Sequence, residues 1–343
     1  MKRHLNTLFV TSQGTYLAKD GQAVAVRAKK ETLLRVPLLN LDGIVCFGRV
    51  GCSPLLMAAC AEANVTISFL SEYGRFRAAV VGFSPGNVIL RREQYRRADD
   101  ESSAVAIARN SISAKIAKCR HVLMRGARDT NDTTRQEALQ QATRVMARQL
   151  DDSRQAQSLD RLRGIEGDAA GTYFGVFNQL VNIDEPDFSF VGRSRRPPLD
   201  RVNALLSFLY TLLTHDARSA CEATGLDAAV GFLHRDRSGR PGLALDLIEE
   251  FRPFLADRLA LSLINRRQVT ASGFTVSESG AVFMDDKVRK ILLTAYQKRK
   301  QDTILHPFVN ETMSIGLLLH MQARLLARHL RGDLDAYPPF VWK

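Results

Sequence analysis

The sequence contains no apolar run of about 20 residues, the length that a membrane-crossing helix needs. Near the N-terminus the short apolar run Leu8-Phe9-Val10 ends at polar residues, so no secretory signal fits there. Only five cysteines occur in 343 residues, and the spacing of Cys46, Cys52 and Cys60 is not that of a zinc finger. We therefore expect a cytoplasmic protein with reduced, structural thiols.

Several catalytic signatures are also missing from the sequence. There is no G-x-x-x-x-G-K-[ST] phosphate loop, no G-x-G-x-x-G after a strand, no H-E-x-x-H and no G-x-S-x-G. The sequence therefore gives no support for nucleotide hydrolysis, hydride transfer or hydrolysis by a catalytic serine.

Basic residues, in contrast, are in excess, with 48 Lys and Arg against 36 Asp and Glu and a net charge of +12. Such a charge favours a polyanionic partner, either nucleic acid or an anionic membrane surface. Residues 1–97 hold 14 basic and 6 acidic residues, a net charge of +8, so the remainder of the chain carries only +4. That remainder nevertheless gathers its bases in short groups, which include Arg193/Arg195/Arg196, Arg235/Arg237/Arg240, Arg266/Arg267, Lys287/Arg289/Lys290 and Lys298/Arg299/Lys300.

The residue pattern predicts an α+β protein with two domains. Residues 1–92 are typical of a small β domain, with short strands separated by turn residues and one helix in which Ser53 is the N-cap and Pro54 the first residue. The strands are expected at 4–10, 16–18, 23–26, 35–38, 66–70 and 76–81, and the helix at 53–63. Residues 93–343 have helical periodicity. Helices are expected at 102–126, 131–150, 156–180, 199–224, 243–266, 284–300 and 305–331, with a basic loop at 184–198.

One acidic segment is unusual because Glu166 lies between Gly164 and Gly167 inside a helical pattern. Each glycine costs about 1 kcal/mol relative to alanine within a helix. Either a substrate backbone approaches Glu166 closely, or another helix crosses there and requires small residues. The sequence leaves both explanations open.

A second acidic segment follows an apolar run that ends at His234. The helix that starts after Pro241 carries Asp246 and Glu249, three residues apart and therefore on one helix face. Leucine and isoleucine crowd this short helix, which predicts that it is buried, and buried carboxylates need a cation. The loop between His234 and Pro241 contributes three arginines that could bind a nucleic-acid backbone, namely Arg235, Arg237 and Arg240.

Together, Glu166, His234 and Glu249 offer two carboxylates and one imidazole. This set suits Mn²⁺ or Mg²⁺, with the nitrogen favouring Mn²⁺ and with zinc as the alternative metal. Such an ion could polarise a phosphodiester. The competing interpretation is that the histidine is structural and the acids belong to a solvated helix face.

At these residues the sequence resembles the CRISPR-associated Cas-one family of spacer-acquisition integrases and DNA endonucleases, most closely the form that accompanies type I-C systems. The resemblance covers nearly the whole chain. It is carried by the blocks Leu5-Asn6-Thr7-Leu8-Phe9-Val10-Thr11, Arg163-Gly164-Ile165-Glu166-Gly167 with Tyr173-Phe174, Gly231-Phe232-Leu233-His234, Leu243 to Pro253, and the ending Tyr337-Pro338-Pro339-Phe340-Val341-Trp342-Lys343.

The resemblance implies metal ligands at Glu166, His234 and Glu249, with Asp246 as a further acid that supports activity. Many relatives carry Asp where this chain has Glu249. It therefore stays open whether Asp246 or Glu249 is the primary ligand, or whether Glu250 substitutes. DNA contacts are expected from Arg235, Arg237, Arg240, Arg193, Arg195 and Arg196.

The implied reaction is a transesterification in which the 3′-hydroxyl of a short DNA attacks a phosphodiester at the border of a CRISPR repeat. Water as the nucleophile would give endonuclease activity instead. The implied partners are double-stranded DNA, a second copy of the chain bound through the β domain, and a dimer of the small companion protein Cas-two. Two other functions remain possible from the residues themselves: a non-catalytic DNA-binding scaffold and an RNA-directed nuclease.

Overall fold

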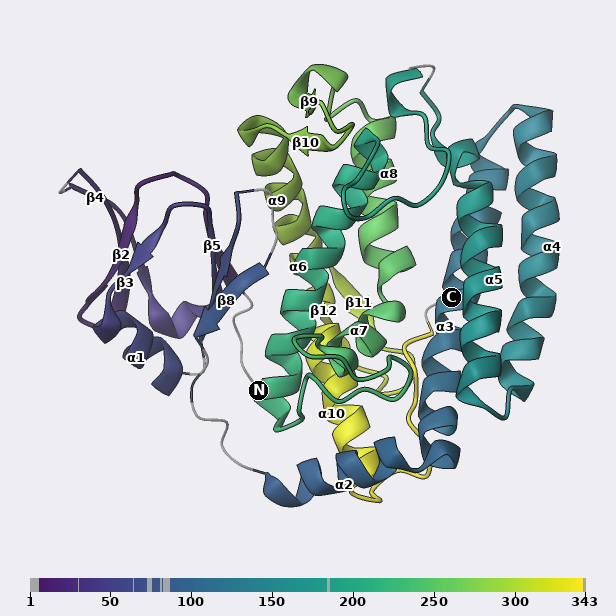
Figure 1. The fold of residues 1–343 in the computed structure, drawn as a ribbon, viewed down its shortest axis with the longest axis horizontal. Coiled ribbons are helices and arrows are strands. Elements are labelled where there is room, and N and C mark those ends of the chain that lie inside the picture. Colours follow the sequence, from purple (N-terminus) through teal and green to yellow (C-terminus); the bar gives the residue numbers. More distant parts are fainter. Residues whose placement is uncertain are drawn as a thin grey trace.

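A computed structural model describes residues 6–29, 31–63, 65–72, 76–80, 82, 87–183 and 186–341. The expected α+β class is confirmed: strands dominate the first part of the chain, and a larger helical part follows (Figure 1). Some expected features lie outside the described residues, namely the strand start at 4–5, a strand end at 81, the loop start at 184–185 and the terminal residues 342–343.

Two four-stranded sheets form the N-terminal part. The first has the order β1-β5-β7-β8, with β1, β5 and β7 parallel and β8 antiparallel. The second has the order β4-β3-β2-β6, so β4 is an edge strand. The strands are β1 (Asn6–Val10), β2 (Tyr16–Asp20), β3 (Ala23–Ala28), β4 (Glu31–Pro37), β5 (Leu41–Phe47), β6 (Gly51–Cys52), β7 (Thr66–Leu70) and β8 (Phe76–Val80).

The helix α1 (Pro54–Glu62) confirms the expected start, because Ser53 Oγ accepts a hydrogen bond from the Leu56 amide at 3.2 Å and Pro54 is the first helical residue. The strand β5, however, is absent from the expected strands. It runs through the middle of its sheet, and residues 43–47 therefore form a continuous apolar run instead of an alternating one.

Helices make up most of the remaining chain, and none of those described is both long and apolar enough to cross a lipid bilayer. A long helix α3 packs against α4 and α5, while α6 packs against α7 and α10. The helices are α2 (Val88–Asp99), α3 (Glu101–Asp129), α4 (Thr133–Gln155), α5 (Leu159–Gly175), α6 (Arg201–Thr224), α7 (Gly242–Glu249), α8 (Arg258–Asn265), α9 (Asp286–Gln301) and α10 (Leu318–Leu330).

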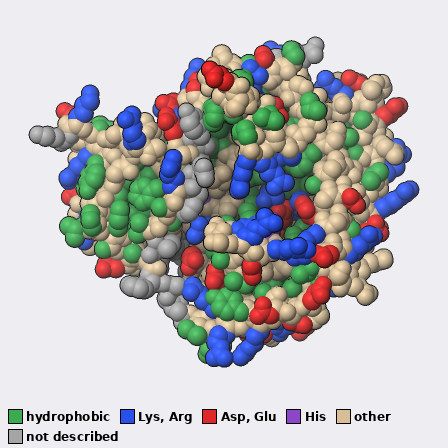
Figure 2. Space-filling model, viewed as in Figure 1, with side chains coloured by type: hydrophobic (Ala, Val, Ile, Leu, Met, Phe, Trp, Pro, Cys, Tyr) green, Lys and Arg blue, Asp and Glu red, His purple; other side chains and the backbone are tan. Residues whose placement is uncertain are grey.

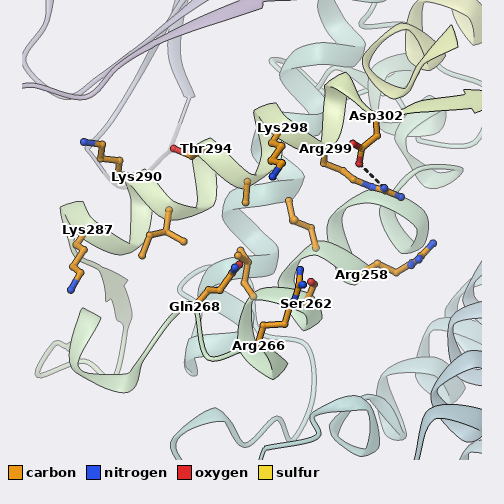
Figure 3. Close-up of a pocket in the computed structure, with 14 residues that line it drawn as sticks. Arg258, Ser262, Arg266, Gln268, Lys287, Lys290, Thr294, Lys298, Arg299 and Asp302 are labelled. Atoms are coloured by element: carbon orange, nitrogen blue, oxygen red, sulfur yellow. Dashed lines mark hydrogen bonds and ion pairs between the residues drawn. The ribbon is translucent and has the colours of Figure 1, made fainter.

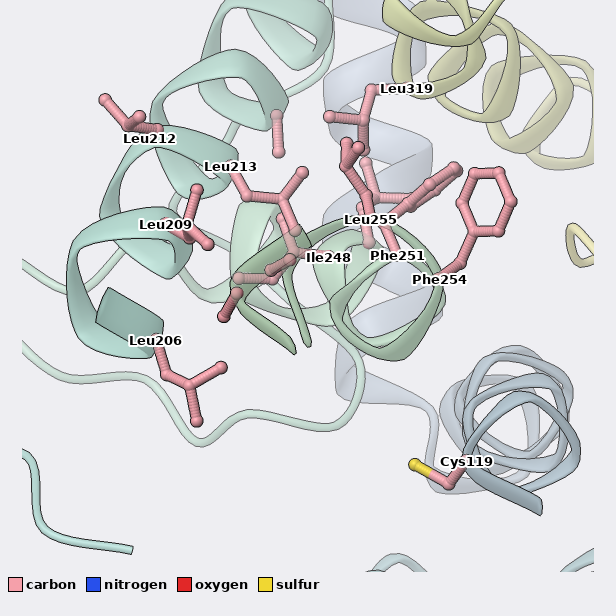
Figure 4. Packing of buried hydrophobic residues seen from close by; sticks show 14 of the residues in the cluster. Cys119, Leu206, Leu209, Leu212, Leu213, Ile248, Phe251, Phe254, Leu255 and Leu319 are labelled. Carbon is pink, nitrogen blue, oxygen red and sulfur yellow. The ribbon is translucent and has the colours of Figure 1, made fainter. Parts of the chain in front are cut away.

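The helix expected at 243–266 is wrong as a single element. It consists of α7, a π-helical turn at Arg252–Asp257, and α8. Pro253 lies in this turn, and a proline has no amide to continue an α-helical hydrogen-bond series. After the break, Phe251 and Phe254 pack against Phe340, with ring centroids 5.4 and 5.5 Å from it, and Ile248 and Leu255 belong to the same buried cluster as the leucines of α6 (Figure 4).

The helix expected at 305–331 begins later than predicted. Residues before α10 form a hairpin of β11 (Thr303–Leu305) and β12 (Thr312–Ser314), in which Asn310 takes a left-handed conformation with φ of 57°. A second short hairpin, β9 (Phe274–Val276) with β10 (Val282–Met284), precedes α9 and is also absent from the expected elements. The strands of both hairpins are too short to show the alternation of apolar and polar residues by which a strand is recognised in a sequence.

Candidate active site

Asp246 of α7 organises the segment that contains His234. Its Oδ2 accepts hydrogen bonds from the amides of Phe232 at 2.6 Å and Leu233 at 3.0 Å, and its Oδ1 accepts one from the amide of His234 at 3.1 Å. The same Oδ1 lies 2.6 Å from His234 Nδ1. A carboxylate at Nδ1 keeps the proton there, so Nε2 is the nitrogen that is left to bind a ligand.

Two glycines allow this close approach between α7 and the segment before it. A Cβ on Gly231 would lie 2.6 Å from Asp246 Oδ2, and one on Gly242 would lie 2.5 Å from the Ala229 carbonyl oxygen. Any larger residue at either position would therefore displace Asp246 or the start of α7.

Glu249 is almost fully buried, and it is held by two cations. Its Oε1 lies 2.6 Å from Arg252 Nη1, and its Oε2 lies 2.7 Å from Lys115 Nζ of α3. Burial by itself would raise the pKa of Glu249, but Arg252, Lys115 and His234 outweigh it and lower the pKa to about 2. The carboxylate is consequently ionised at every working pH.

Lys115 also joins Glu166 to this site, because its Nζ forms an ion pair with Glu166 Oε1. Two acids that are 83 positions apart in sequence numbering therefore meet at a single ammonium group. The sequence analysis missed Lys115. Its signal was a lysine in the apolar stripe of a helix, a position where an unpaired charge would be costly.

The glycines beside Glu166 lie on the exposed side of α5. A Cβ on Gly164 or Gly167 would meet no atom of the described residues within 4 Å. The crossing-helix explanation for these glycines is therefore wrong. Open space next to the carboxylate remains, and a ligand could enter it.

Glu250 has a different set of partners from Glu249. Its Oε1 accepts hydrogen bonds from Tyr337 Oη at 2.7 Å and from Ser111 Oγ at 3.0 Å, and its Oε2 accepts from the Phe340 amide at 2.7 Å. A fourth hydrogen bond comes from Gln322 Nε2 at 3.1 Å. With both oxygens used in this way, Glu250 is not placed to substitute for Glu249.

A small cavity of about 40 Å³ adjoins Glu166 and the two cations that hold Glu249, Lys115 and Arg252. Lys115, Glu166, Arg195 and Tyr210 are among the residues that line it, together with Asp257 from the π-helical turn. Burial raises the pKa of Asp257 to about 6, although hydrogen bonds from the tyrosines lower it; Tyr210 Oη donates to it at 2.6 Å.

The six predicted DNA-binding arginines do not all have the same surroundings. Arg193 packs over the Tyr210 ring, 5.1 Å from its centroid, and Arg235 pairs with Asp160 at 2.9 Å. Burial lowers the pKa of Arg240, and neighbouring guanidinium groups lower it further. These neighbours are Arg237, Arg196 and Arg195. Four of the six predicted side chains therefore form one positive group near Asp246.

The donor chemistry of the site suits a hard divalent cation. Glu249 Oε2 is buried, and the Lys115 ammonium at 2.7 Å is the partner that the described residues give it. A carboxylate oxygen has a second lone pair, and such an oxygen, a second carboxylate and an imidazole are ligands that Mg²⁺ and Mn²⁺ accept. In the described part of the chain no three acidic, histidine or cysteine side chains already converge as a metal cluster. The Lys115 ammonium group lies between the Glu166 and Glu249 carboxylates instead.

Comparisons with known proteins identify the family of the chain. A family model described as "CRISPR associated protein Cas1" matches residues 8–298. Over 343 residues the chain is 54% identical to "CRISPR-associated endonuclease Cas1 1" of Chlorobaculum tepidum, with 100% of both chains covered.

Two solved structures share the fold. One is a CAS1 protein from Thermotoga maritima, with 23% identity, a TM-score of 0.83, and coverage of 98% of this chain and 100% of that one. The other is a casposase bound to an integration product, with 21% identity, a TM-score of 0.84, and coverage of 99% and 95%. The match to the family model and the identity to the Chlorobaculum protein decide the assignment: the chain belongs to the CRISPR-associated Cas1 family of endonucleases.

Proposed function

We propose that this chain is a divalent-metal-dependent DNA integrase and endonuclease of CRISPR adaptation, which inserts short DNA spacers into the repeat array by 3′-hydroxyl transesterification. The observation that carries the proposal is the meeting of two acids, Glu166 and ionised Glu249, beside a histidine oriented by Asp246. The 54% identical relative from Chlorobaculum tepidum is named as an endonuclease, which supports the same chemistry.

Glu166, Glu249 and His234 Nε2 are the groups that would hold Mn²⁺ or Mg²⁺. A bound ion of this kind activates a hydroxyl nucleophile and stabilises the charge that develops on a phosphodiester. Asp246 accepts the Nδ1 proton of the imidazole and thereby leaves Nε2 as the ligand nitrogen. Lys115 neutralises the charge of the two acids in the structure.

The protein groups around the acids position the DNA. Arg195, Arg196, Arg237 and Arg240 form the positive group near the site and would bind phosphates without reading the bases. The exposed glycine face of α5 lets the sugar-phosphate backbone come close to Glu166. The entering group is a DNA 3′-hydroxyl in strand joining and a water molecule in cleavage.

A second candidate function is a DNA-binding scaffold without chemistry of its own. One observation favours it: Lys115 already pairs with both acids, as it would if they served only to stabilise the fold. The two functions predict different results when the His234 imidazole is removed. An integrase should lose strand joining, whereas a scaffold should show no change in chemistry.

We expect His234→Ala to reduce Mn²⁺-dependent strand joining on a supercoiled, repeat-bearing plasmid by at least about a hundredfold, because the only nitrogen ligand is lost. Chelation of the metal should abolish joining by the unmodified protein. DNA affinity should stay within about twofold, since the arginines remain. His329→Ala, a histidine on α10, is the matched control. Undiminished joining by His234→Ala would favour the scaffold.

The proposed assembly includes a homodimer formed through the β domain and a bridging dimer of the companion protein Cas2. The edge strand β4 supports a two-fold interface because Leu33 and Leu34 are both exposed on it. Antiparallel pairing of two β4 strands about Leu33 would place Glu31 opposite Arg35 of the other copy, a favourable cross-strand charge pair.

We expect the double substitution Leu33→Glu and Leu34→Glu to convert the dimer to a monomer, because the two carboxylates introduced at position 33 would lie directly opposite each other and the two introduced at position 34 would add like charge on the other face of the paired strands. Light scattering after size-exclusion chromatography measures the mass. Leu199→Glu is the matched control, since Leu199 and Leu33 are both 58% exposed. A dimer that persists in the double variant would place the interface elsewhere.

A further inference from the structure

A basic groove lies between α8 and α9, apart from the residues that hold the acids (Figure 3). Its volume is about 820 Å³. Aliphatic side chains of the two helices form the floor, and charged or polar side chains form the walls. The wall residues are Arg258, Ser262, Arg266, Gln268, Lys287, Lys290, Thr294, Lys298, Arg299 and Asp302.

The positive charge of the groove is largely uncompensated. Asp302 is the single carboxylate among the lining residues, and it pairs with Arg299 at 2.8 Å. Arg266, Lys287, Lys290 and Lys298 are exposed and have no ion pair with a carboxylate of the described residues. Each of these four cations is therefore available to a polyanion.

The electrostatics of Arg258 agree with an excess of cations. Burial lowers the pKa of Arg258, and the charges of Arg125 and Arg299 lower it further. An anion in the groove would relieve this repulsion. Lys and Arg side chains also gather in the hollowed middle of the face shown in Figure 2.

Helical periodicity arranges the wall residues in two rows. On α9, Lys287, Lys290, Thr294 and Lys298 recur every three or four residues, so they lie along one face. From Lys287 to Lys298 this row is about 16 Å long at 1.5 Å per residue. A DNA strand places about one phosphate in every 3.4 Å of helix axis, so the row spans about five nucleotides.

Among the described residues, the lining contains hydroxyl and amide donors but no aromatic side chain. Single-stranded DNA is usually bound through aromatic side chains on which its bases stack. Without such a platform, the groove contacts a backbone only, which favours a duplex whose bases are already stacked.

The groove is connected to the candidate active site through the chain itself. Asp257 accepts hydrogen bonds from Tyr173 and Tyr210 beside the acids, and the next residue, Arg258, lines the groove. The groove and the cavity beside Glu166 are therefore lined by consecutive residues, Arg258 and Asp257, which places one end of the groove near the candidate active site.

We propose that the α8–α9 groove binds one strand of a DNA duplex by its phosphates and holds the part of the substrate that lies beyond the reacting bond. The proposal rests on the proposed DNA function, but it concerns a separate set of residues. It predicts that the groove contributes more to the binding of long duplexes than of short ones.

The test is the triple variant Arg266→Ala, Lys290→Ala and Lys298→Ala in the full chain. Binding to a long duplex is measured by fluorescence anisotropy between about 0.05 and 0.2 M salt. We expect affinity to fall about tenfold or more, and the slope of log affinity against log salt to flatten by about 2 to 3. Strand joining on a duplex too short to reach the groove should stay unchanged.

A second triple variant removes the same charge elsewhere, at Arg144, Arg148 and Arg324, which are exposed on α4 and α10. It should bind the long duplex as the unmodified protein does. Equal salt slopes for the two triple variants would overturn the groove proposal and leave the proposed function intact. Joining that is absent from the unmodified protein would instead overturn the proposed function, while the binding comparison still decides the groove. If the groove variant lost affinity for duplex RNA but not for duplex DNA, the groove proposal would also be overturned.

Discussion

Glu249→Gln is expected to reduce metal-dependent strand joining by about a thousandfold or more, since the loss of a charged ligand removes several kcal/mol of stabilisation from the transition state. The glutamine keeps the shape of the side chain and removes the charge. The pKa of about 2 shows that Lys115, Arg252 and His234 all stabilise the ionised form. A neutral amide cannot serve as the anionic ligand for a hard cation.

A readout other than activity separates metal binding from folding. Mn²⁺ should raise the melting temperature of the unmodified protein and leave that of Glu249→Gln unchanged, because a ligand stabilises only a state that binds it. Glu249→Asp keeps the charge and should recover part of both effects. Full joining activity in Glu249→Gln would show that Glu249 is not a metal ligand.

Glu250→Gln, one residue further along the chain, is expected to lower the free energy of unfolding by about 2 to 4 kcal/mol and to leave the chemistry of the folded protein largely intact. Glu250 accepts four hydrogen bonds, two of them from Tyr337 and Phe340 in the C-terminal segment. An amide in its place presents a donor where the Phe340 amide or a side-chain donor needs an acceptor. The C-terminal segment should therefore detach more readily.

Thermal denaturation measures the loss, which should correspond to about 3 to 6 °C at this chain length. Hydrogen exchange should show loss of protection at the Tyr337 and Phe340 amides before the rest of the chain. Tyr337→Phe removes one of the four hydrogen bonds and should give a smaller loss of about 1 kcal/mol. An unchanged melting temperature in Glu250→Gln would exclude this role.

The two neighbouring glutamates show what a sequence can and cannot decide. Each has its own lysine on α3: Lys115 lies 2.7 Å from the Glu249 carboxylate, and Lys118 Nζ donates to the Glu250 backbone carbonyl at 2.7 Å. Burial lowers the pKa of Lys118 and raises that of Glu250. The sequence identified Glu249 by its spacing on one helix, but the lysine partners of both glutamates come from α3, more than 100 residues earlier in the chain.

For the same reason, the sequence could not decide whether Asp246 or Glu249 is the primary metal ligand. Both are buried acids on one short helix, and no local pattern distinguishes them. Asp246 accepts hydrogen bonds from three backbone amides and lies beside His234 Nδ1, which makes it a positioning residue. Both oxygens of Glu249 face cations, Lys115 and Arg252, instead of backbone amides, which makes Glu249 the better candidate ligand.

Local signals predicted the elements that depend on local interactions. The Ser53 cap, strand β7 at 66–70 and the long amphipathic helices agree with the expected ranges within a few residues. The errors fell where tertiary contacts overcome local preference: the central strand β5, the break around Pro253, and the hairpin before α10. In each case burial or chain reversal determines the element, and periodicity carries little information about either.

The sequence by itself determined the α+β class, the excess of positive charge, and four chemically distinctive residues, Glu166, His234, Asp246 and Glu249, because composition and short-range spacing are properties of the chain alone. Only the tertiary structure decided that Lys115 bridges two of the acids, that Asp246 orients the histidine, and that α8 and α9 place their cations on either side of one groove. The reason is that charge pairing acts over a few ångströms in space, and the residues it joins are separated by tens of positions in the sequence.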